Sequence, residues 1–135
     1  MTLPAHTTRQ LELAARLIRN CRNGVAFTGA GISVPSGIPA FRSATNGLWN
    51  RFDPMEVASL TAFRKRPEAF FNWLEPLVRD SFNAQPNPAH NALAKMQTGG
   101  FLRTIITQNI DGLHQIAGSP DVIELHGNLK TLICL

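Results

Sequence analysis

Apolar side chains follow two spacings in this chain. Between residues 11 and 21 they recur on one helical face, and Asn23-Gly24 ends that pattern. Thr7 and Gln10 have the spacing of a capping box at its start. Continuous apolar runs at 25–27 and 101–106 are typical of strands buried on both faces of a parallel sheet, and 122–125 predicts a third, short strand. Helical patterns that alternate with such runs predict an α/β fold.

The helical face at 11–21 includes Cys21, so we expect this thiol to be packed in the core rather than reactive. Further along, Asp53-Pro54 predicts the N-cap and first residue of a short helix, a longer helix is expected from about Pro67, and Asn87-Pro88 begins the helix after it. Pro76 lies inside the longer pattern and predicts a kink or break just before it. The aromatic-rich region 63–82 predicts a small helical lobe, which either forms its own core or lines an apolar substrate channel.

Composition places these elements in one domain, residues 1–135. The chain is 44% apolar and carries a net charge of +4, too mild to favour nucleic-acid binding, and its densest basic run is only Arg64-Lys65-Arg66. No run of 18 apolar residues occurs, so no membrane association is expected. Two cysteines do not make a disulfide framework, and the cytoplasm is the simplest compartment.

The first candidate site is the small-residue turn Gly29-Ala30-Gly31, which directly follows the first predicted strand. Such turns begin dinucleotide-binding units, because small residues let a pyrophosphate approach the backbone N–H groups. The turn lacks the full G-x-G-x-x-G pattern, so a plain strand-to-loop turn remains an alternative. The loop 36–42 interrupts both helix and strand patterns and carries Phe41 and Arg42, as a cover over a bound cofactor would.

The second candidate site lies at the ends of the later strands. Gln108, Asn109 and Asp111 follow the run 101–106, and His126 follows 122–125. Ligands of open α/β sheets bind at the carboxyl ends of strands. Asn109 or Asp111 could instead cap a helix at 112–117, and a single histidine is often structural.

Together these motifs resemble the sirtuin family of NAD-dependent protein lysine deacylases. The resemblance rests on residues 29–33, 37–42, 107–111 and 126–127, with 86–90 as a further match. It implies a Rossmann-like parallel sheet with flanking helices and a small helical lobe. It covers only the first part of the family's catalytic domain, before the zinc module and the later strands are complete. Residues 1–135 alone are therefore expected to be inactive.

The resemblance also implies roles for individual residues. His126 would be the general base that takes a proton from a ribose hydroxyl, and Asn109 and Asp111 would assist catalysis. Phe41 would keep water from the cation that forms when nicotinamide leaves. The implied contacts to NAD come from Gly29, Ala30, Gly31, Ser33, Phe41, Arg42, Gln108, Asn109, Ile110 and Asp111. Removal of the acyl group from a lysine of a protein or peptide would yield nicotinamide and 2′-O-acyl-ADP-ribose.

Three features qualify this resemblance. Ala40 stands where many sirtuins have Asp, which puts one loop hydrogen bond in question. Leu74 and Leu77 stand where succinyl-removing members are expected to have Tyr and Arg, which favours acetyl or longer apolar acyl groups. Cys134 matches the first of four zinc cysteines, and one thiolate cannot hold structural zinc. Two alternatives remain, a non-catalytic fragment that binds NAD or ADP-ribose, and a protein ADP-ribosyltransferase.

Overall fold

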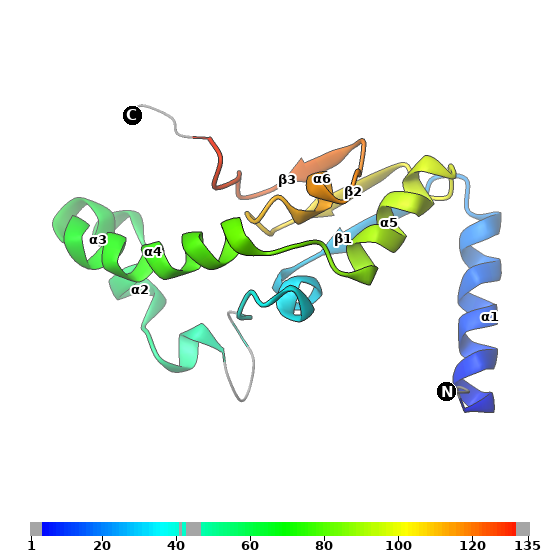
Figure 1. The fold of residues 1–135 in the computed structure, drawn as a ribbon, viewed down its shortest axis with the longest axis horizontal. Coiled ribbons are helices and arrows are strands. Elements are labelled where there is room, and N and C mark those ends of the chain that lie inside the picture. The colour runs from blue at the N-terminus through cyan, green and yellow to red at the C-terminus, as the bar shows by residue number, and fades with distance from the viewer. Residues whose placement is uncertain (1–3, 41, 43–46, 132–135) are drawn as a thin grey trace.

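A three-stranded parallel sheet lies at the centre of the protein (Figure 1). The computed structural model describes residues 4–40, 42 and 47–131. The strands are β1 (Val25–Thr28), β2 (Thr104–Thr107) and β3 (Val122–Glu124), in the order β1-β2-β3. Ala26 pairs with Ile105, which pairs in turn with Val122. The predicted α/β class is confirmed, and the register brings all three carboxyl ends to one edge.

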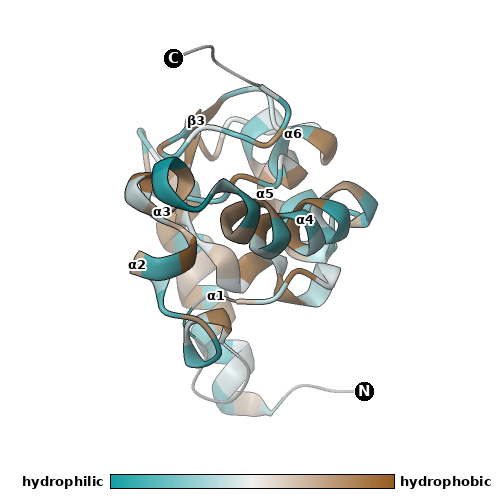
Figure 2. Cartoon of the chain, turned by 90° about the vertical axis from the view of Figure 1, so that its left-hand side faces the viewer, coloured by the Kyte–Doolittle hydropathy of each residue, from teal (hydrophilic) through white to brown (hydrophobic). Residues whose placement is uncertain are grey.

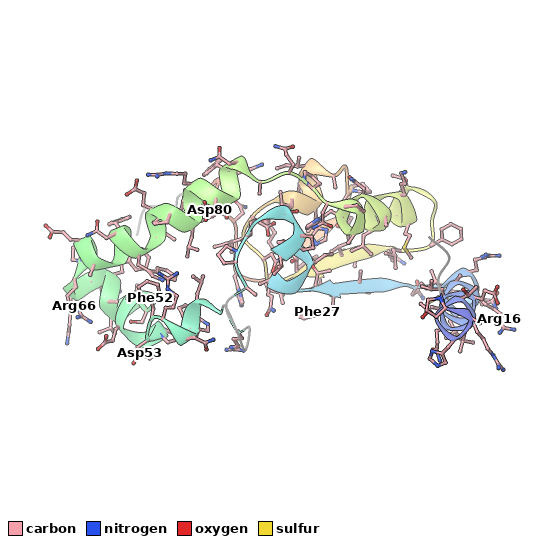
Figure 3. The ribbon with its side chains drawn as sticks, turned by 60° about the horizontal axis from the view of Figure 1, so that its bottom comes forward. Arg16, Phe27, Phe52, Asp53, Arg66 and Asp80 are labelled. Atoms are coloured by element: carbon pink, nitrogen blue, oxygen red, sulfur yellow. The ribbon has the colours of Figure 1, made fainter. Side chains whose placement is uncertain are left out.

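Burial differs between the central strand and its neighbours. Within β2, Ile105 is fully buried and Thr107 is 2% exposed. On β1, Phe27 is 66% exposed and Val25 is 49% exposed, so the expected burial of β1 on both faces is wrong. Figure 3 labels Phe27 on this edge strand. The run 25–27 is apolar, but the described residues do not cover its outer side.

Two helices pack beside the sheet and carry buried polar side chains. They are α5 (Pro88–Thr98) and α6 (Leu113–Ile116), which contact each other. Asn87 caps α5 by accepting the Ala89 N–H at 2.9 Å, and Pro88 is its first residue, as the sequence predicts. The cap is completed by the His90 side chain, which accepts the Asn87 N–H.

The first helix, α1 (Ala5–Asn20), stands apart from the sheet in Figures 1 and 3. It has no buried residue, and Cys21 beyond it is exposed, so the expected packing of this face and of Cys21 is wrong for the described chain. The helix also begins before Thr7, with Pro4 as N-cap, so the predicted capping box is wrong. An amphipathic pattern identifies a face that avoids water, but it does not supply the surface that covers it.

A helical lobe lies at the opposite end of the molecule from α1 (Figure 1). It comprises η2 (Leu48–Asn50), α2 (Pro54–Val57), α3 (Leu60–Lys65) and α4 (Pro67–Asn83). Brown and teal segments alternate along these helices in Figure 2, as amphipathic packing requires. Trp49 stacks on Trp73 with ring centroids 5.8 Å apart, and Phe63 meets Phe70 edge to face at 5.3 Å.

The long helix of the lobe continues through Pro76, which contradicts the expected break. Pro76 is exposed, while Trp73 and Leu77 on either side are partly buried and line a cavity between the lobe and the ends of the strands. Packing on both sides of the proline therefore holds the helix together despite one missing hydrogen bond. A small buried cluster of Ile38, Ala84 and Leu113 joins the loop after β1, the end of α4 and α6.

Among the residues that the structure describes, no helix is long and apolar enough to cross a membrane.

We expect residues 1–135, taken alone, to be poorly stable and prone to aggregate. Phe27 and Val25 on the edge strand and Leu17 on α1 are all about half exposed or more. Each unburied large side chain forgoes roughly 1.5–3 kcal/mol. A thermal scan with light scattering should show a broad transition with aggregation, reduced by Phe27→Ser. Lys95→Ser, on the exposed face of α5, is the matched control. A sharp, reversible transition of a monomer would contradict this expectation.

Candidate active site

The candidate site lies at the edge of the sheet where the three strands end. The turn after β1 leads into η1 (Ala30–Ser36), a 3-10 helix. Gln108 follows β2 directly and donates its N–H to the Thr28 carbonyl at 3.2 Å. His126 lies two residues beyond the end of β3. The topology thus brings together the two groups of residues that the sequence singled out separately.

A cleft of about 770 Å³ opens over this edge. The described residues that line it are Phe27, Thr28, Gly29, Ala30, Gly31, Ile32, Ala40, Arg42, Trp49, Gln108, Asn109 and His126. Its volume lies in the range of ligand and cofactor sites. The Arg42 guanidinium supplies a positive charge beside the small-residue turn.

The two glycines of the turn differ in what a side chain at each position would meet. A Cβ at Gly31 would meet no atom of the other described residues within 4 Å, so among these residues nothing fills the space before it. A Cβ at Gly29 would instead overlap the side-chain amide of Gln108. The first N–H groups of η1, at Ala30 and Gly31, have no partner inside the helix. The backbone here therefore fits the diphosphate of NAD.

A second cavity of about 310 Å³ lies between the strand ends and the helical lobe. Its apolar wall comes from α4, through Phe70, Trp73, Leu74 and Leu77. Its polar wall comes from the site, including Ser33, Asn109 and Asp111. Four of the described residues line both cavities, namely Ala30, Gln108, Asn109 and His126. The lobe therefore contributes to a cavity at the site, in addition to forming its own aromatic cluster.

Ser33 connects the two halves of the polar wall. Its buried hydroxyl donates to Asp111 Oδ2 at 2.7 Å and accepts from Asn109 Nδ2 at 3.1 Å. The Asn109 amide also donates to the Gly29 carbonyl at 3.1 Å. Asn109 therefore orders the turn after β1, and no contact of its side chain caps a helix. Asp111 Oδ1 also accepts the Leu113 N–H at 2.9 Å at the start of α6, whose N-cap residue is Gly112.

His126 is exposed at the mouth of both cavities, and its hydrogen bond determines its tautomer. Nδ1 lies 3.0 Å from the Gln108 carbonyl oxygen. A carbonyl only accepts, so Nδ1 carries the proton of the neutral ring. Nε2 then keeps a free lone pair. This is the form in which a histidine takes a proton from a substrate hydroxyl.

Two further histidines lie beneath the site, and the sequence analysis did not single out either as functional. His90 on α5 is fully buried and His114 on α6 is 1% exposed, with ring centroids 4.9 Å apart. Burial lowers the pKa of both imidazoles, and Asp111 opposes this shift. The sequence does contain a signal for His90, which lies three residues after Asn87, the spacing of a capping box. The sequence contains no such signal for His114.

Two predicted site residues, Phe41 and Cys134, lie outside the described residues. The other predicted site residues all lie at this edge of the sheet. Among the residues described, no group of three or more histidine, cysteine or acidic side chains could hold a metal ion.

Comparison with known proteins connects this geometry to one family. The Sir2 family model matches residues 29–135. The chain is 47% identical over 126 residues to NAD-dependent protein deacylase 2 of Archaeoglobus fulgidus, covering 93% of this chain and 49% of that protein. A solved Sir2 homolog–NAD complex superposes with a TM-score of 0.78 at 48% identity, covering 87% of this chain and 46% of the other.

A second solved structure, Sir2 bound to acetylated peptide, superposes with a TM-score of 0.75 at 39% identity. It covers 88% of this chain and 46% of the other. The chain spans about half the length of the curated relatives it matches. The family model covers most of the chain, and the site residues lie within the matched range, so the chain belongs to the Sir2 family.

Proposed function

We propose that the protein is an NAD-dependent protein lysine deacylase, and that residues 1–135 hold the part of its catalytic domain that surrounds the reacting end of NAD. The observation that carries this proposal is the position of His126. It lines both cavities, and its Nδ1 proton is held by the Gln108 carbonyl. Relatives named NAD-dependent protein deacylase or deacetylase support the same activity.

Bound NAD would supply the ribose that releases nicotinamide and accepts the acyl group; with one molecule of water, the products would be nicotinamide, 2′-O-acyl-ADP-ribose and free lysine. The open backbone at Gly31 and the Arg42 charge hold the diphosphate. Asn109 and Gln108, which line both cavities, orient the ribose. His126 Nε2 takes a proton from a ribose hydroxyl. Asp111, fixed by Ser33 and by the Leu113 N–H, binds the carboxamide of nicotinamide together with Ile110.

Several parts of the proposal concern residues or properties outside the described structure. Phe41 shields the reacting centre from water. Cys134 contributes one of four ligands to a structural zinc ion in the longer protein. The partners are acylated lysines of proteins or peptides, and the composition favours the cytoplasm.

Replacing the proposed base should separate two partial reactions. In a protein of the relatives' length, His126→Ala should slow deacylation by about 10²–10⁴ while leaving exchange of labelled nicotinamide into NAD. The base acts after nicotinamide has left, so only the later step depends on it. His6→Ala, at an exposed position on α1, is the control.

Equal loss of both activities, or normal deacylation, would refute the base role of His126.

The fate of a labelled acyl group separates the competing functions. Label recovered on ADP-ribose supports deacylation, while label retained on the peptide with ADP-ribose attached to protein supports ADP-ribosyl transfer. Binding of NAD without release of nicotinamide would indicate a binding fragment.

Asp111→Asn and Asn109→Ala should each slow turnover and weaken inhibition by added nicotinamide. Both side chains are held by Ser33 at the cavity wall, so both changes alter the nicotinamide contact. Inhibition constants and kcat would be measured beside Asp80→Asn, an exposed control on α4. Wild-type kinetics and inhibition in both variants would restrict these residues to structural roles.

The apolar wall of the smaller cavity predicts the class of acyl group. Leu74 and Leu77 present hydrocarbon where a succinyl carboxylate would need a cation and a hydrogen-bond donor. We expect kcat/KM for acetyl and longer unbranched acyl peptides to exceed that for succinyl peptide by at least about tenfold, or 1.4 kcal/mol. Comparable values for succinyl and acetyl peptides would overturn this preference.

A further inference from the structure

A buried chain of hydrogen bonds links α6 to the candidate site. His114 Nε2 lies 2.9 Å from Thr28 Oγ1, and Thr28 Oγ1 lies 2.9 Å from Thr107 Oγ1. Thr107 Oγ1 in turn accepts the backbone N–H of Asn109 at 3.1 Å. The chain therefore runs from α6 across the ends of β1 and β2 to the main chain of a proposed nicotinamide-ribose residue.

The direction of the bond between His114 and Thr28 follows from the single hydrogen of the Thr28 hydroxyl, which is directed to Thr107. If the Thr28 hydroxyl donates to Thr107, it must accept from His114, which then carries its proton on Nε2. The reverse direction would place that proton on Nδ1, which is buried and has no hydrogen-bond partner among the described residues. A buried N–H without an acceptor is rarer than a buried acceptor without a donor. The geometry thus favours neutral His114 as the donor that begins the chain.

A second chain of hydrogen bonds begins at His90, and its direction also runs from an imidazole Nε2–H to a hydroxyl. His90 Nδ1 accepts the Asn87 N–H at 3.3 Å, so its proton lies on Nε2, which faces Ser33 Oγ at 3.5 Å. The Ser33 hydroxyl in turn donates a hydrogen bond to Asp111. The two rings contact each other, so neutral His90 and neutral His114 form one buried layer below Asn109 and Asp111.

We propose that His114 is a positioning residue: its Nε2–H fixes the hydroxyls of Thr28 and Thr107, which hold the main chain at Asn109 and so direct the Asn109 side chain to the cofactor. This rests on the proposed function for what Asn109 binds. The positioning itself concerns only contacts within this chain. Thr28 also lines the larger cleft, so the chain of bonds reaches the cofactor space directly.

The test uses a protein of the relatives' length, four single variants and one double variant. His114→Phe keeps an aromatic ring for packing and removes the donor, whereas His114→Gln keeps an N–H donor at about the same reach. Thr28→Val removes the hydroxyl at similar volume, and Thr28→Ser retains it. The readouts are the Kd for NAD by calorimetry and the amide ¹H–¹⁵N shift of Asn109 in the protein without NAD.

We expect His114→Phe and Thr28→Val each to raise the Kd by about three- to tenfold, the effect of one neutral hydrogen bond. Each should also move the Asn109 amide signal. The double variant should resemble either single variant, because both changes break the same chain. His114→Gln and Thr28→Ser should stay near wild type in both readouts.

The proposal would be overturned if His114→Phe had the wild-type Kd for NAD and the wild-type Asn109 amide shift. Equal loss in His114→Phe and His114→Gln, with additive effects of Thr28→Val, would also overturn it, because it would mean that the imidazole acts by packing alone. If the wild type bound no NAD, the proposed function would fail, while the Asn109 shift would still decide the positioning role.

Acid stability provides a second measurement. The groups that face His114 are His90 from α5 and Asp111 from the segment after β2. Since burial lowers the pKa of both imidazoles below 6.5, the unfolded chain binds more protons than the folded protein below pH 6.5. The contribution of the two neutral histidines to the free energy of unfolding is therefore fully present above pH 6.5, and it is lost as the pH decreases below that value. His114→Gln should make this fall shallower, and an unchanged slope would count against a buried neutral His114.

Discussion

The site depends on the hydrogen bonds that the Ser33 hydroxyl makes. This hydroxyl is fully buried and has a single hydrogen, which goes to Asp111, so it accepts from Asn109 and faces His90 as an acceptor. One small side chain thereby joins the turn after β1, the end of β2 and the start of α5. An unsatisfied polar group at this depth would cost about 1–3 kcal/mol, so each partner constrains the others.

The site has two walls with different physical character. The wall at the strand ends is polar and held by short hydrogen bonds, which fix the positions of Asn109 and Asp111. The wall from α4 is apolar and comes from a lobe held mainly by aromatic packing. This division suits the proposed reaction, which needs fixed groups around a ribose beside an apolar space for an acyl chain.

The sheet and α1 leave apolar surface exposed in the described chain. Phe27 and the leucines of α1 have no cover among the described residues. The relatives are about twice as long as this chain. Packing within the described residues is therefore concentrated at the site, in the polar layer of Ser33, His90 and His114 and in Leu113 beside it.

The sequence by itself predicted the α/β class, the three strands, the helix capped by Asn87 and the two groups of candidate site residues. These features depend on local periodicity and on turn and cap chemistry, which a few neighbouring residues determine. The resemblance to sirtuins followed from short motifs that keep their order along the chain. Local patterns also gave wrong predictions of burial, because the apolar face of α1, Cys21 just beyond it and the strand at Phe27 are not covered by the described residues.

Only the tertiary structure decided which residues touch. Thr28 and Thr107 are 79 positions apart, and Ser33 and His90 are 57 apart, yet each pair is in contact beneath the site. No periodicity marks His114 as part of this layer, because its role depends on where a parallel crossover places α6 against β1. Burial and the protons on three histidines follow from such long-range contacts, and these determine the chemistry that each side chain can perform.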